Sequence, residues 1–389
     1  MQATQAIVLS PAWPGSTYGY ELAIASSLAS YARTYRRVLF CCITEDPKPP
    51  SAWPNVELVH VPIRKPSKAL RFFKSLASSS PAITQLFRSP GVSRAIALEV
   101  GRRDLLNERT DIIFEDLPVA SLAQAFRTED DDNRFVMRSH NVVSEAFEGF
   151  EATGNLLSRL AWKYENARIR RFEKHVLESC DSVYTITARD LNEYRRRYQF
   201  EADGVLGVDF DQSSLAEKAQ FVEIAEDPLA IVHLGTVDLR KGHGIREFVE
   251  QVFRPLRVTM PALRLVLGGR NSEQYHSADN NIEGHGFIDD EGDFLCKGRI
   301  FVNPQKLGTG VKIKSLVAMS YGRVLVTTPK GIEGIDAVNG EHCFVAKNND
   351  DMVTCLQHLM DSPDEVARVS HNAYNFVLEN YCRPGDAQA

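Results

Sequence analysis

A glycine-rich turn with two lysines stands at Gly308–Lys314, with the sequence Gly-Thr-Gly-Val-Lys-Ile-Lys. Glycine lets backbone N–H groups approach a ligand closely, and a helix amino terminus carries roughly half a positive charge. The apolar pattern that follows predicts a helix starting here, so Lys312 and Lys314 fall in its first turn, where the dipole disfavours cations by ~0.3–1 kcal/mol. This placement favours an anion site, with a solvated strand-to-helix turn as the alternative. The candidate residues are Gly308, Thr309, Gly310, Lys312 and Lys314.

A second cationic turn follows the apolar run 229–235. Gly235 ends that run, and Arg240, Lys241 and Gly242 come just before the next helical pattern, 245–253. Arginine offers a fork of donors and lysine a point charge, a pair that suits a diphosphate; an ordinary surface loop is the alternative. Neither turn is a Walker loop or a G-x-G-x-x-G fingerprint, which disfavours P-loop and dinucleotide chemistry.

These turns must be positioned by strands and helices, and short apolar runs do alternate with amphipathic stretches along the whole chain, a pattern typical of parallel α/β sheets. The predicted strands of the front half are 6–10, 38–43, 56–61, 111–115, 134–138, 182–186 and 204–209, with helices at 18–32, 157–179 and 188–198. A second series has strands at 229–235, 263–267, 300–303, 324–328 and 343–345, and a helix from 362.

The restart predicts an α/β chain of two Rossmann-like domains that face a cleft with the carboxyl ends of their strands. The predicted division is a front domain 1–210, a linker 211–228, a back domain 229–372, and a tail 373–389 that packs back on the front domain.

Composition excludes several classes of protein. The 389 residues are 43% hydrophobic and carry a net charge of −6, which excludes a disordered chain and disfavours nucleic-acid binding. The seven cysteines form no C-x-x-C pair, as expected of free thiols in a reducing compartment. The sequence shows neither a signal-peptide pattern nor an apolar stretch of about 20 residues, so we expect a cytoplasmic protein, at most peripheral at the inner membrane face.

Several segments, in this order and spacing, resemble the retaining GT-B glycosyltransferases of family 4 (group 1), including sugar transferases of bacterial polysaccharide biosynthesis. The resemblance covers nearly the whole chain. In the front half it rests on Arg138–Val143, on Arg171-Phe172-Glu173, on Cys180–Val183 and on Gly207-Val208-Asp209. In the back half it rests on Gly235 with Lys241-Gly242, on Gly308–Met319 and on Gly322–Gly334.

The resemblance implies transfer of a sugar from a nucleotide-diphosphate sugar to a glycan or lipid-linked acceptor, with no cofactor and no metal. The back domain would hold the donor, with Lys241 on the diphosphate and the Gly308–Lys314 turn beside the phosphates or the sugar. His140 would be the catalytic residue, hydrogen-bonding the sugar or a developing charge; a strand-end histidine satisfied by the backbone is the alternative. The acceptor side would include Gly15, Tyr18, Gly19 and Arg138.

The sequence departs from the family at one important place. Members usually carry two glutamates eight positions apart at the back-domain turn, and here those positions hold Thr309 and Val317. A valine cannot accept hydrogen bonds from a ribose, a loss of about 1.5–3 kcal/mol of donor binding. Glu333, in the loop after the next strand, is the candidate substitute. A GT-B partner or glycan-binding subunit without activity is therefore the alternative function, and a nucleotide-sugar epimerase is a third.

Other patterns carry weaker indications. Asp209-Phe210-Asp211 matches the D-x-D metal motif of the other large glycosyltransferase fold but lies at the predicted linker. Glu115-Asp116 follows a front-domain strand and is a candidate for an acceptor role. The basic amphipathic stretch 64–76 fits either a solvated helix face or contact with an anionic membrane, and the latter would favour a lipid-linked acceptor.

Overall fold

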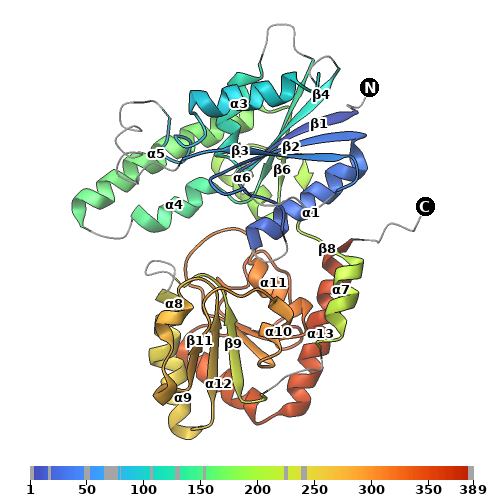
Figure 1. The fold of residues 1–389 in the computed structure, drawn as a ribbon. Coiled ribbons are helices and arrows are strands. Elements are labelled where there is room, and N and C mark those ends of the chain that lie inside the picture. Colours follow the sequence, from blue (N-terminus) through green and yellow to red (C-terminus); the bar gives the residue numbers. More distant parts are fainter. Residues whose placement is uncertain are drawn as a thin grey trace. The chain divides into compact units, whose positions relative to one another are not determined.

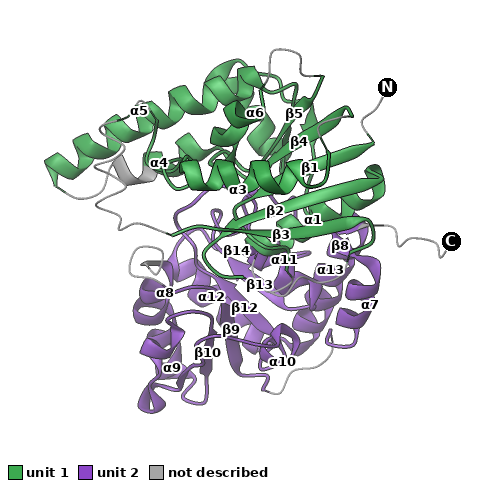
Figure 2. Ribbon diagram, turned by 45° about the horizontal axis from the view of Figure 1, so that its top comes forward, with its two compact units in different colours: residues 1–16, 20–208 green, residues 17–19, 209–389 purple. Residues whose placement is uncertain are grey.

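The computed structural model divides the chain into two compact units (Figures 1 and 2). Unit 1 comprises residues 1–16 and 20–208, and unit 2 comprises residues 17–19 and 209–389. The structure describes residues 4–15, 19–47, 53–64, 78, 80–105, 108–127, 132–151, 155–222, 227–237 and 243–383.

Unit 1 is built on a parallel sheet with the strand order β3-β2-β1-β4-β5-β6-β7. The strands are β1 (Gln5–Ser10), β2 (Arg37–Thr44), β3 (Val56–Pro62), β4 (Thr110–Glu115), β5 (Arg134–Ser139), β6 (Ser182–Thr185) and β7 (Gly204–Val205). The helices are α1 (Gly19–Thr34), α3 (Pro90–Gly101), α4 (Val143–Glu151), α5 (Leu156–Ser179) and α6 (Ala188–Tyr198), with a 3₁₀ segment, η1 (Val119–Ala125), after β4.

Alternation along the strands of unit 1 supplies two apolar cores. In β1, Ala6 and Val8 pack with Ile24 and Leu28 of α1 on one face, whereas Ile7 and Leu9 pack on the other. That second core also contains residues of α3, η1 and α5. Successive side chains of a strand point to opposite faces, so a strand covered on both sides must be apolar throughout. This is why the strands were recognisable as continuous apolar runs.

Unit 2 carries a second parallel sheet with the order β11-β10-β9-β12-β13-β14. Its strands are β9 (Ala230–Leu234), β10 (Arg264–Gly268), β11 (Ile282–Gly284), β12 (Ile300–Asn303), β13 (Val324–Thr327) and β14 (Phe344–Val345). The helices are α7 (Gln212–Ala219), α8 (His243–Phe248), α9 (Arg254–Thr259), α10 (Glu291–Leu295), α11 (Ile313–Ser320), α12 (Asn349–Met360) and α13 (Pro363–Tyr381), with a π-helical turn, η2 (Val249–Phe253), joining α8 to α9.

Most predicted strands are confirmed to within two residues, and the predicted α/β class with two Rossmann-like domains is confirmed. Strand β11 was missed because Ile-Glu-Gly is too short to show a pattern. The predicted strand 204–209 is correct only for Gly204–Val205. The stretch predicted as linker contains α7, and the tail continues α13 into β15 (Cys382–Arg383), which pairs with β8 (Phe210–Asp211).

Within the described ranges, no helix is long and apolar enough to cross a membrane.

Candidate functional site

Each sheet has one place where the strand order reverses. In unit 1 it lies between β1 and β4, and in unit 2 between β9 and β12. Ligands of open α/β sheets bind outside the carboxyl ends of the strands at such a switch point, because the loops on either side diverge there. The residues that follow β4, β5, β9 and β12 are therefore the first place to look for chemistry.

At the switch point of unit 1, a buried polar cluster surrounds Glu115. Its strand neighbour in register is Arg138, whose Nη1 donates to Glu115 Oε2 at 3.1 Å. His140 Nε2 lies 2.7 Å from the same oxygen, and the Tyr31 hydroxyl donates to Oε1 at 2.7 Å. Glu115 and Arg138 are fully buried, and His140 is 6% exposed. Three donors thus converge on one carboxylate.

The contacts keep Glu115 ionised. Burial raises the pKa of this carboxyl, but the Arg138 guanidinium and the hydrogen bond with His140 lower it more, and the net pKa is about 2. Arg138 in turn donates to the carbonyls of Ala23, Leu206 and Gly207. All of these hydrogen-bond acceptors belong to unit 1. Arg138 was predicted on the side of the sugar acceptor, and in the structure it fixes the buried cluster around Glu115.

The ionised carboxylate also determines which nitrogen of His140 carries the proton. Nε2 could accept from Arg138 Nη1 at 3.4 Å or donate to Glu115 at 2.7 Å. The shorter contact, to an acceptor-only group, assigns the proton to Nε2. No hydrogen-bond partner of Nδ1 is found among the described residues. The histidine is therefore held by a carboxylate rather than by the backbone, and Nδ1 is the nitrogen left for a ligand.

Asp116 is the second carboxylate of this cluster and adopts an unusual backbone conformation. Its φ is 89°, a region that a non-glycine residue enters at a cost of roughly 1–3 kcal/mol. Its Oδ2 accepts from the Tyr20 hydroxyl at 3.0 Å, and the Tyr20 ring packs on His140 with centroids 4.5 Å apart. Burial raises the pKa of Asp116, whereas that of Glu115 is lowered. Oppositely shifted neighbouring carboxyls and local strain are typical of functional sites.

Helix α4, which follows His140, is fixed by a carboxylate from α5. Glu173 accepts from the backbone N–H of Val143 at 2.8 Å and of Ser144 at 3.3 Å, and the Tyr198 hydroxyl donates to it at 2.6 Å. It thus caps the amino terminus of α4, where N–H groups lack helical partners. This contact gives Arg171-Phe172-Glu173 a physical role: it holds the segment that carries His140.

In unit 2, the carboxyl end of β9 brings together His233, Gly235 and Lys314. His233 Nδ1 lies 2.8 Å from the carbonyl of Val302, which can only accept, so Nδ1 carries the proton. Burial, then the Lys314 charge, lowers the pKa of His233 to about 3, so the ring is neutral. A Cβ on Gly235 would lie 2.9 Å from Lys314 Nζ and 3.3 Å from His233 Nε2. A side chain at this position would displace the Lys314 ammonium from the end of the strand.

The glycine-rich turn of unit 2 has the conformation that its sequence indicated. Gly308 and Gly310 have φ values of 107° and 75°, which favour glycine. Lys312, only 4% exposed, donates to the Gly310 carbonyl and to Glu333 Oε2 at 3.2 Å. Lys330 donates to the other oxygen of Glu333 at 2.8 Å. Much of the Lys312 charge is therefore balanced within the unit, by the residue predicted as a substitute carboxylate.

Glu333 is held in its ionised form by these two lysines. Burial raises its pKa, but the contacts of Lys330 and Lys312 outweigh burial and hold the pKa below its ordinary value. Lys312, Lys314 and Lys330 together outnumber this carboxylate. The segments that follow β12 and β13 thus supply three lysines to this part of unit 2.

Helix α11 is positioned by a polar network at the end of β12. Asn303 Nδ2 donates to Ser315 Oγ at 2.9 Å and to the Gly331 carbonyl at 3.0 Å, and Ser315 Oγ donates to the same carbonyl at 2.8 Å. A Cβ on Gly331 would lie 2.1 Å from Thr327 Oγ1. The two loops that carry Lys312 and Glu333 are therefore tied to one strand end.

The two positions that depart from the family pattern differ in character. Val317 is 7% exposed and lies on the buried face of α11. Thr309 Oγ1 is buried and has no hydrogen-bond partner in the described part of the chain. A buried polar atom without a partner is uncommon in folded proteins, so Thr309 is a candidate ligand contact.

The remaining predicted residues are placed as follows. Gly15 lies in the loop after β1, where a Cβ would meet Glu21 Oε2 at 2.6 Å, and Gly19 is the first residue of α1. Tyr18, Arg240 and Lys241 lie outside the described residues, as does most of the basic stretch 64–76. Asp211 of the D-x-D pattern caps α7 by accepting from Ser213 and Ser214. No group of three or more potential metal ligands occurs among the described residues.

Sequence reasoning missed part of both clusters. No sequence motif marked Tyr20, Tyr31, His233 or Asn303. Glu115-Asp116 was only a minor candidate. The one available signal was position: Glu115, His140 and Asn303 each end or follow an apolar strand.

Comparison with known proteins finds a family model that matches most of the predicted back domain. Residues 228–362 match the family model described as Glycosyl transferases group 1. An uncharacterized 44.6 kDa protein in the cps region of Klebsiella pneumoniae is 34% identical over 85 residues, and this match spans 21% of each chain. The chain is thus matched over about a fifth of that curated relative.

Several solved structures resemble the whole chain. Sucrose-phosphate synthase from Thermosynechococcus elongatus has a TM-score of 0.69 at 15% identity and covers 97% of this chain and 95% of its own. WaaG, a glycosyltransferase involved in lipopolysaccharide biosynthesis, has a TM-score of 0.64 at 12% identity, with 95% of both chains covered. HepE of Anabaena in complex with UDP has a TM-score of 0.61 at 12% identity, covering 97% and 96%. At these identities the likeness shows the GT-B fold.

Proposed function

We propose that this chain is a retaining, metal-independent glycosyltransferase. It takes a sugar from a nucleotide-diphosphate donor and passes it to a glycan or lipid-linked acceptor during polysaccharide or glycoconjugate synthesis. One observation carries the proposal. The region that matches Glycosyl transferases group 1 contains Lys312, Lys314 and Lys330, which form the cationic cluster of unit 2. The Anabaena HepE structures, which are complexes with UDP and with UDP-glucose, support a donor of this chemical class.

The cationic cluster of unit 2 suits a diphosphate leaving group. The bond between the sugar C1 and the phosphate oxygen breaks, a bond from C1 to the acceptor oxygen forms, and the acceptor proton passes to the departing diphosphate. One additional negative charge develops on the diphosphate as the C1–oxygen bond breaks, so lysines that are already in place stabilise it without reorganisation. Lys314, Thr309 and the N–H groups of the Gly308–Gly310 turn are assigned to this role, with Arg240 and Lys241 assigned from the sequence.

The cluster of unit 1 is assigned to the acceptor side of the reaction. His140 is held by Glu115 with Nε2 protonated, so Nδ1 is available to accept a hydrogen bond from a sugar or acceptor hydroxyl. Because the leaving diphosphate takes the proton, this histidine needs no raised basicity and acts by orientation. Glu115 and Arg138 are positioning residues, since neither is exposed.

A GT-B partner or glycan-binding subunit without transfer activity is the second candidate. Val317 favours it, because this buried, apolar side chain stands at a position where the resemblance to family 4 implies a glutamate. One experiment distinguishes the two candidate functions. Purified protein is incubated with a panel of radiolabelled nucleotide sugars, and release of free nucleotide diphosphate is measured with and without extracted glycan or lipid acceptors.

The outcome distinguishes the two candidates. Transfer of label to an acceptor from one donor is the expected result. Binding of glycan with no nucleotide-dependent stabilisation in thermal unfolding would instead support the subunit. A bound donor at about 100 times its Kd stabilises the fold by ~2.7 kcal/mol, so thermal unfolding detects it clearly.

We also propose that the chain works in the cytoplasm, at the inner membrane face. Helix α5 supports the membrane contact, because its first half exposes four apolar side chains: Leu156 at 70%, Leu157 at 77%, Leu160 at 54% and Tyr164 at 52%. Arg159 and Lys163, both exposed, lie on the same stretch. Exposed leucines beside basic residues are typical of helices that bind anionic interfaces. Sedimentation with anionic vesicles tests this, with Leu157→Ser expected to reduce the bound fraction.

A further inference from the structure

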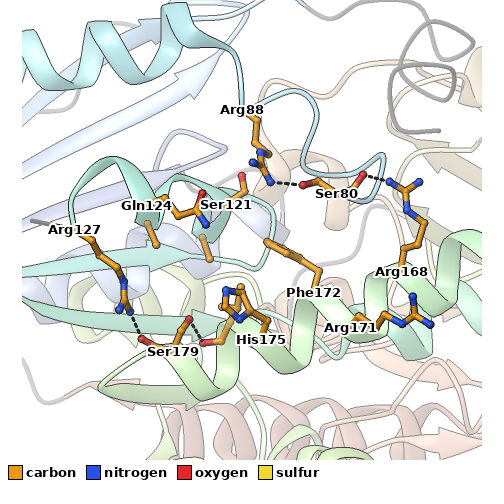
Figure 3. A pocket seen from close by; sticks show the side chains of 13 residues that line it. Ser80, Arg88, Ser121, Gln124, Arg127, Arg168, Arg171, Phe172, His175 and Ser179 are labelled. Atoms are coloured by element: carbon orange, nitrogen blue, oxygen red, sulfur yellow. Dashed lines mark hydrogen bonds between the residues drawn. The ribbon is translucent and has the colours of Figure 1, made fainter. Parts of the chain in front are cut away.

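A cavity of about 480 Å³ in unit 1 is lined by an unusual number of cations (Figure 3). It lies between η1, the loop before α3, and the second half of α5. The charged or titratable side chains that line it are Arg88, Arg127, Arg168, Arg171 and His175, and no acidic side chain is among its described lining residues. None of these residues belongs to the Glu115 cluster.

Three of the arginines carry charge that no described carboxylate balances. Arg168 pairs with Glu165 at 3.0 Å, but Arg88, Arg127 and Arg171 form no ion pair with the described residues. Like charges gathered around one hollow repel one another, and an anionic ligand would relieve that repulsion. The total charge of the chain is −6, so this concentration is local.

Three of the four arginines, Arg88, Arg127 and Arg168, are also held by hydrogen bonds before any ligand binds. Arg88 donates to Ser80 Oγ, and Arg127 donates to the carbonyl of Ser179. Arg168 donates to the carbonyls of Ser78 and Ser80, and so joins the loop to α5. Figure 3 shows the contacts of Ser80 with Arg88 and Arg168, and that of Ser179 with Arg127. A guanidinium has five N–H donors, so Arg88 and Arg127 keep donors that can point at a ligand.

The rest of the lining limits what can bind. Phe172 and Val176 supply an apolar wall, while Ser121 and Gln124 add neutral polar groups. The volume is within the range of small-ligand pockets, roughly 300–1,000 Å³. Forked donors around a hollow match the oxygens of a phosphate better than a single carboxylate, because several N–H groups can engage at once.

We propose that this cavity is a binding site for a phosphate-bearing anion, in which Arg88, Arg127 and Arg171 contact the charged oxygens. The ligand is a free phosphorylated molecule or the headgroup of an anionic lipid, two sources of the same chemistry. All residues that line the site belong to unit 1, and none of them is part of the donor cluster or of the Glu115 cluster.

The test compares two double variants of the full chain. Arg127→Ala/Arg171→Ala removes two exposed arginines of the cavity. The control, Arg170→Ala/Lys174→Ala, removes two exposed cations of α5 that do not line the cavity. The two double variants therefore change the net charge equally. Titration calorimetry with inorganic pyrophosphate is the first measurement, and sedimentation with vesicles of phosphatidylglycerol in phosphatidylcholine is the second. Any pyrophosphate bound in unit 2 contributes equally in both variants.

We expect the cavity variant to lose at least roughly tenfold in pyrophosphate affinity, while the control stays near wild type. Loss of vesicle binding alone, again confined to the cavity variant, would identify a lipid headgroup as the source. Equal binding in all three proteins, or equal loss in both variants, would overturn the proposal. If the double variant unfolds at lower temperature, Arg171→Ala alone repeats the comparison at one exposed position.

Discussion

Glu115 Oε2 and His140 Nε2 lie 2.7 Å apart, although 25 residues separate them in the chain. Arg138 neutralises the same carboxylate from the neighbouring strand position at 3.1 Å. The orientation of the histidine thus depends on a buried ion pair that cannot itself reach a ligand. This dependence makes separable predictions for His140 and Glu115.

His140→Ala should lower turnover by roughly 10²–10³, the usual effect of deleting one group aimed at the transition state. Nucleotide affinity should stay nearly unchanged, because the donor cluster belongs to unit 2. Steady-state kinetics and calorimetry measure the two quantities. His358→Ala, at an exposed position of α12, is the matched control. Wild-type turnover in His140→Ala would show that the residue has only a structural role.

Glu115 should make stability depend on acid pH. Its pKa is about 2 in the folded chain against an ordinary 4.5, so the ionised form stabilises the fold above 4.5, and this contribution is lost as pH falls from 4.5 towards about 2. Glu115→Gln should be less stable at pH 7 by about 3–5 kcal/mol, because Arg138 is left without its counter-charge. Thermal unfolding as a function of pH measures both effects.

The control for Glu115 is Glu365, a partly exposed carboxylate paired with Arg368 at 2.7 Å. Glu365→Gln should change stability little, because surface pairs contribute at most about 1 kcal/mol. If the pH profiles of Glu115→Gln and the wild type run parallel between 4.5 and 2, the buried pair does not titrate as described.

Lys314→Ala and Lys241→Ala should each raise the donor KM, with a loss of about 1.5–3 kcal/mol in donor binding, or roughly tenfold to a hundredfold. Lys314 lies beside the end of β9, and Lys241 belongs to the turn after that strand. Calorimetry with the nucleotide-sugar substrate is the measurement. Lys347→Ala, at an exposed position after β14, is the control. Unchanged donor affinity would remove either lysine from the site.

Chelation of divalent metals should leave activity unchanged. The proposed mechanism stabilises the leaving diphosphate with fixed lysines and backbone N–H groups. The assay compares initial rates with and without EDTA, followed by addition of Mn²⁺ or Mg²⁺. Activity that is lost in EDTA and restored by either ion would contradict this part of the mechanism.

Gly331→Ala should destabilise unit 2, because its Cβ would lie 2.1 Å from Thr327 Oγ1 and 2.5 Å from the Asn303 carbonyl. Overpacking of this kind costs about 1–3 kcal/mol. Gly101→Ala is the control: no atom lies within 4 Å of its Cβ, so its stability should stay level or rise slightly. Differential scanning calorimetry of both variants provides the comparison.

The positions of most strands could be predicted because burial on both faces requires continuous apolar runs, as in Ile7–Leu9. The glycines of the Gly308–Lys314 turn were equally visible, since positive φ angles favour that residue type locally. Strand β11 could not be found in this way, because three residues carry too little pattern. The sequence by itself therefore determined the α/β class, the restart of the strand series and one loop of the candidate site.

Only the tertiary structure decided which side chains contact one another in the candidate sites. Glu115, Arg138 and His140 meet because β4 and β5 are neighbours in register, and strand order is a long-range property that no local pattern encodes. Lys312 was visible as an unfavourable cation at a helix start, but Glu333, which balances it, arrives from beyond the next strand. Propensity and periodicity act over a few residues, whereas these contacts depend on how whole strands pack side by side.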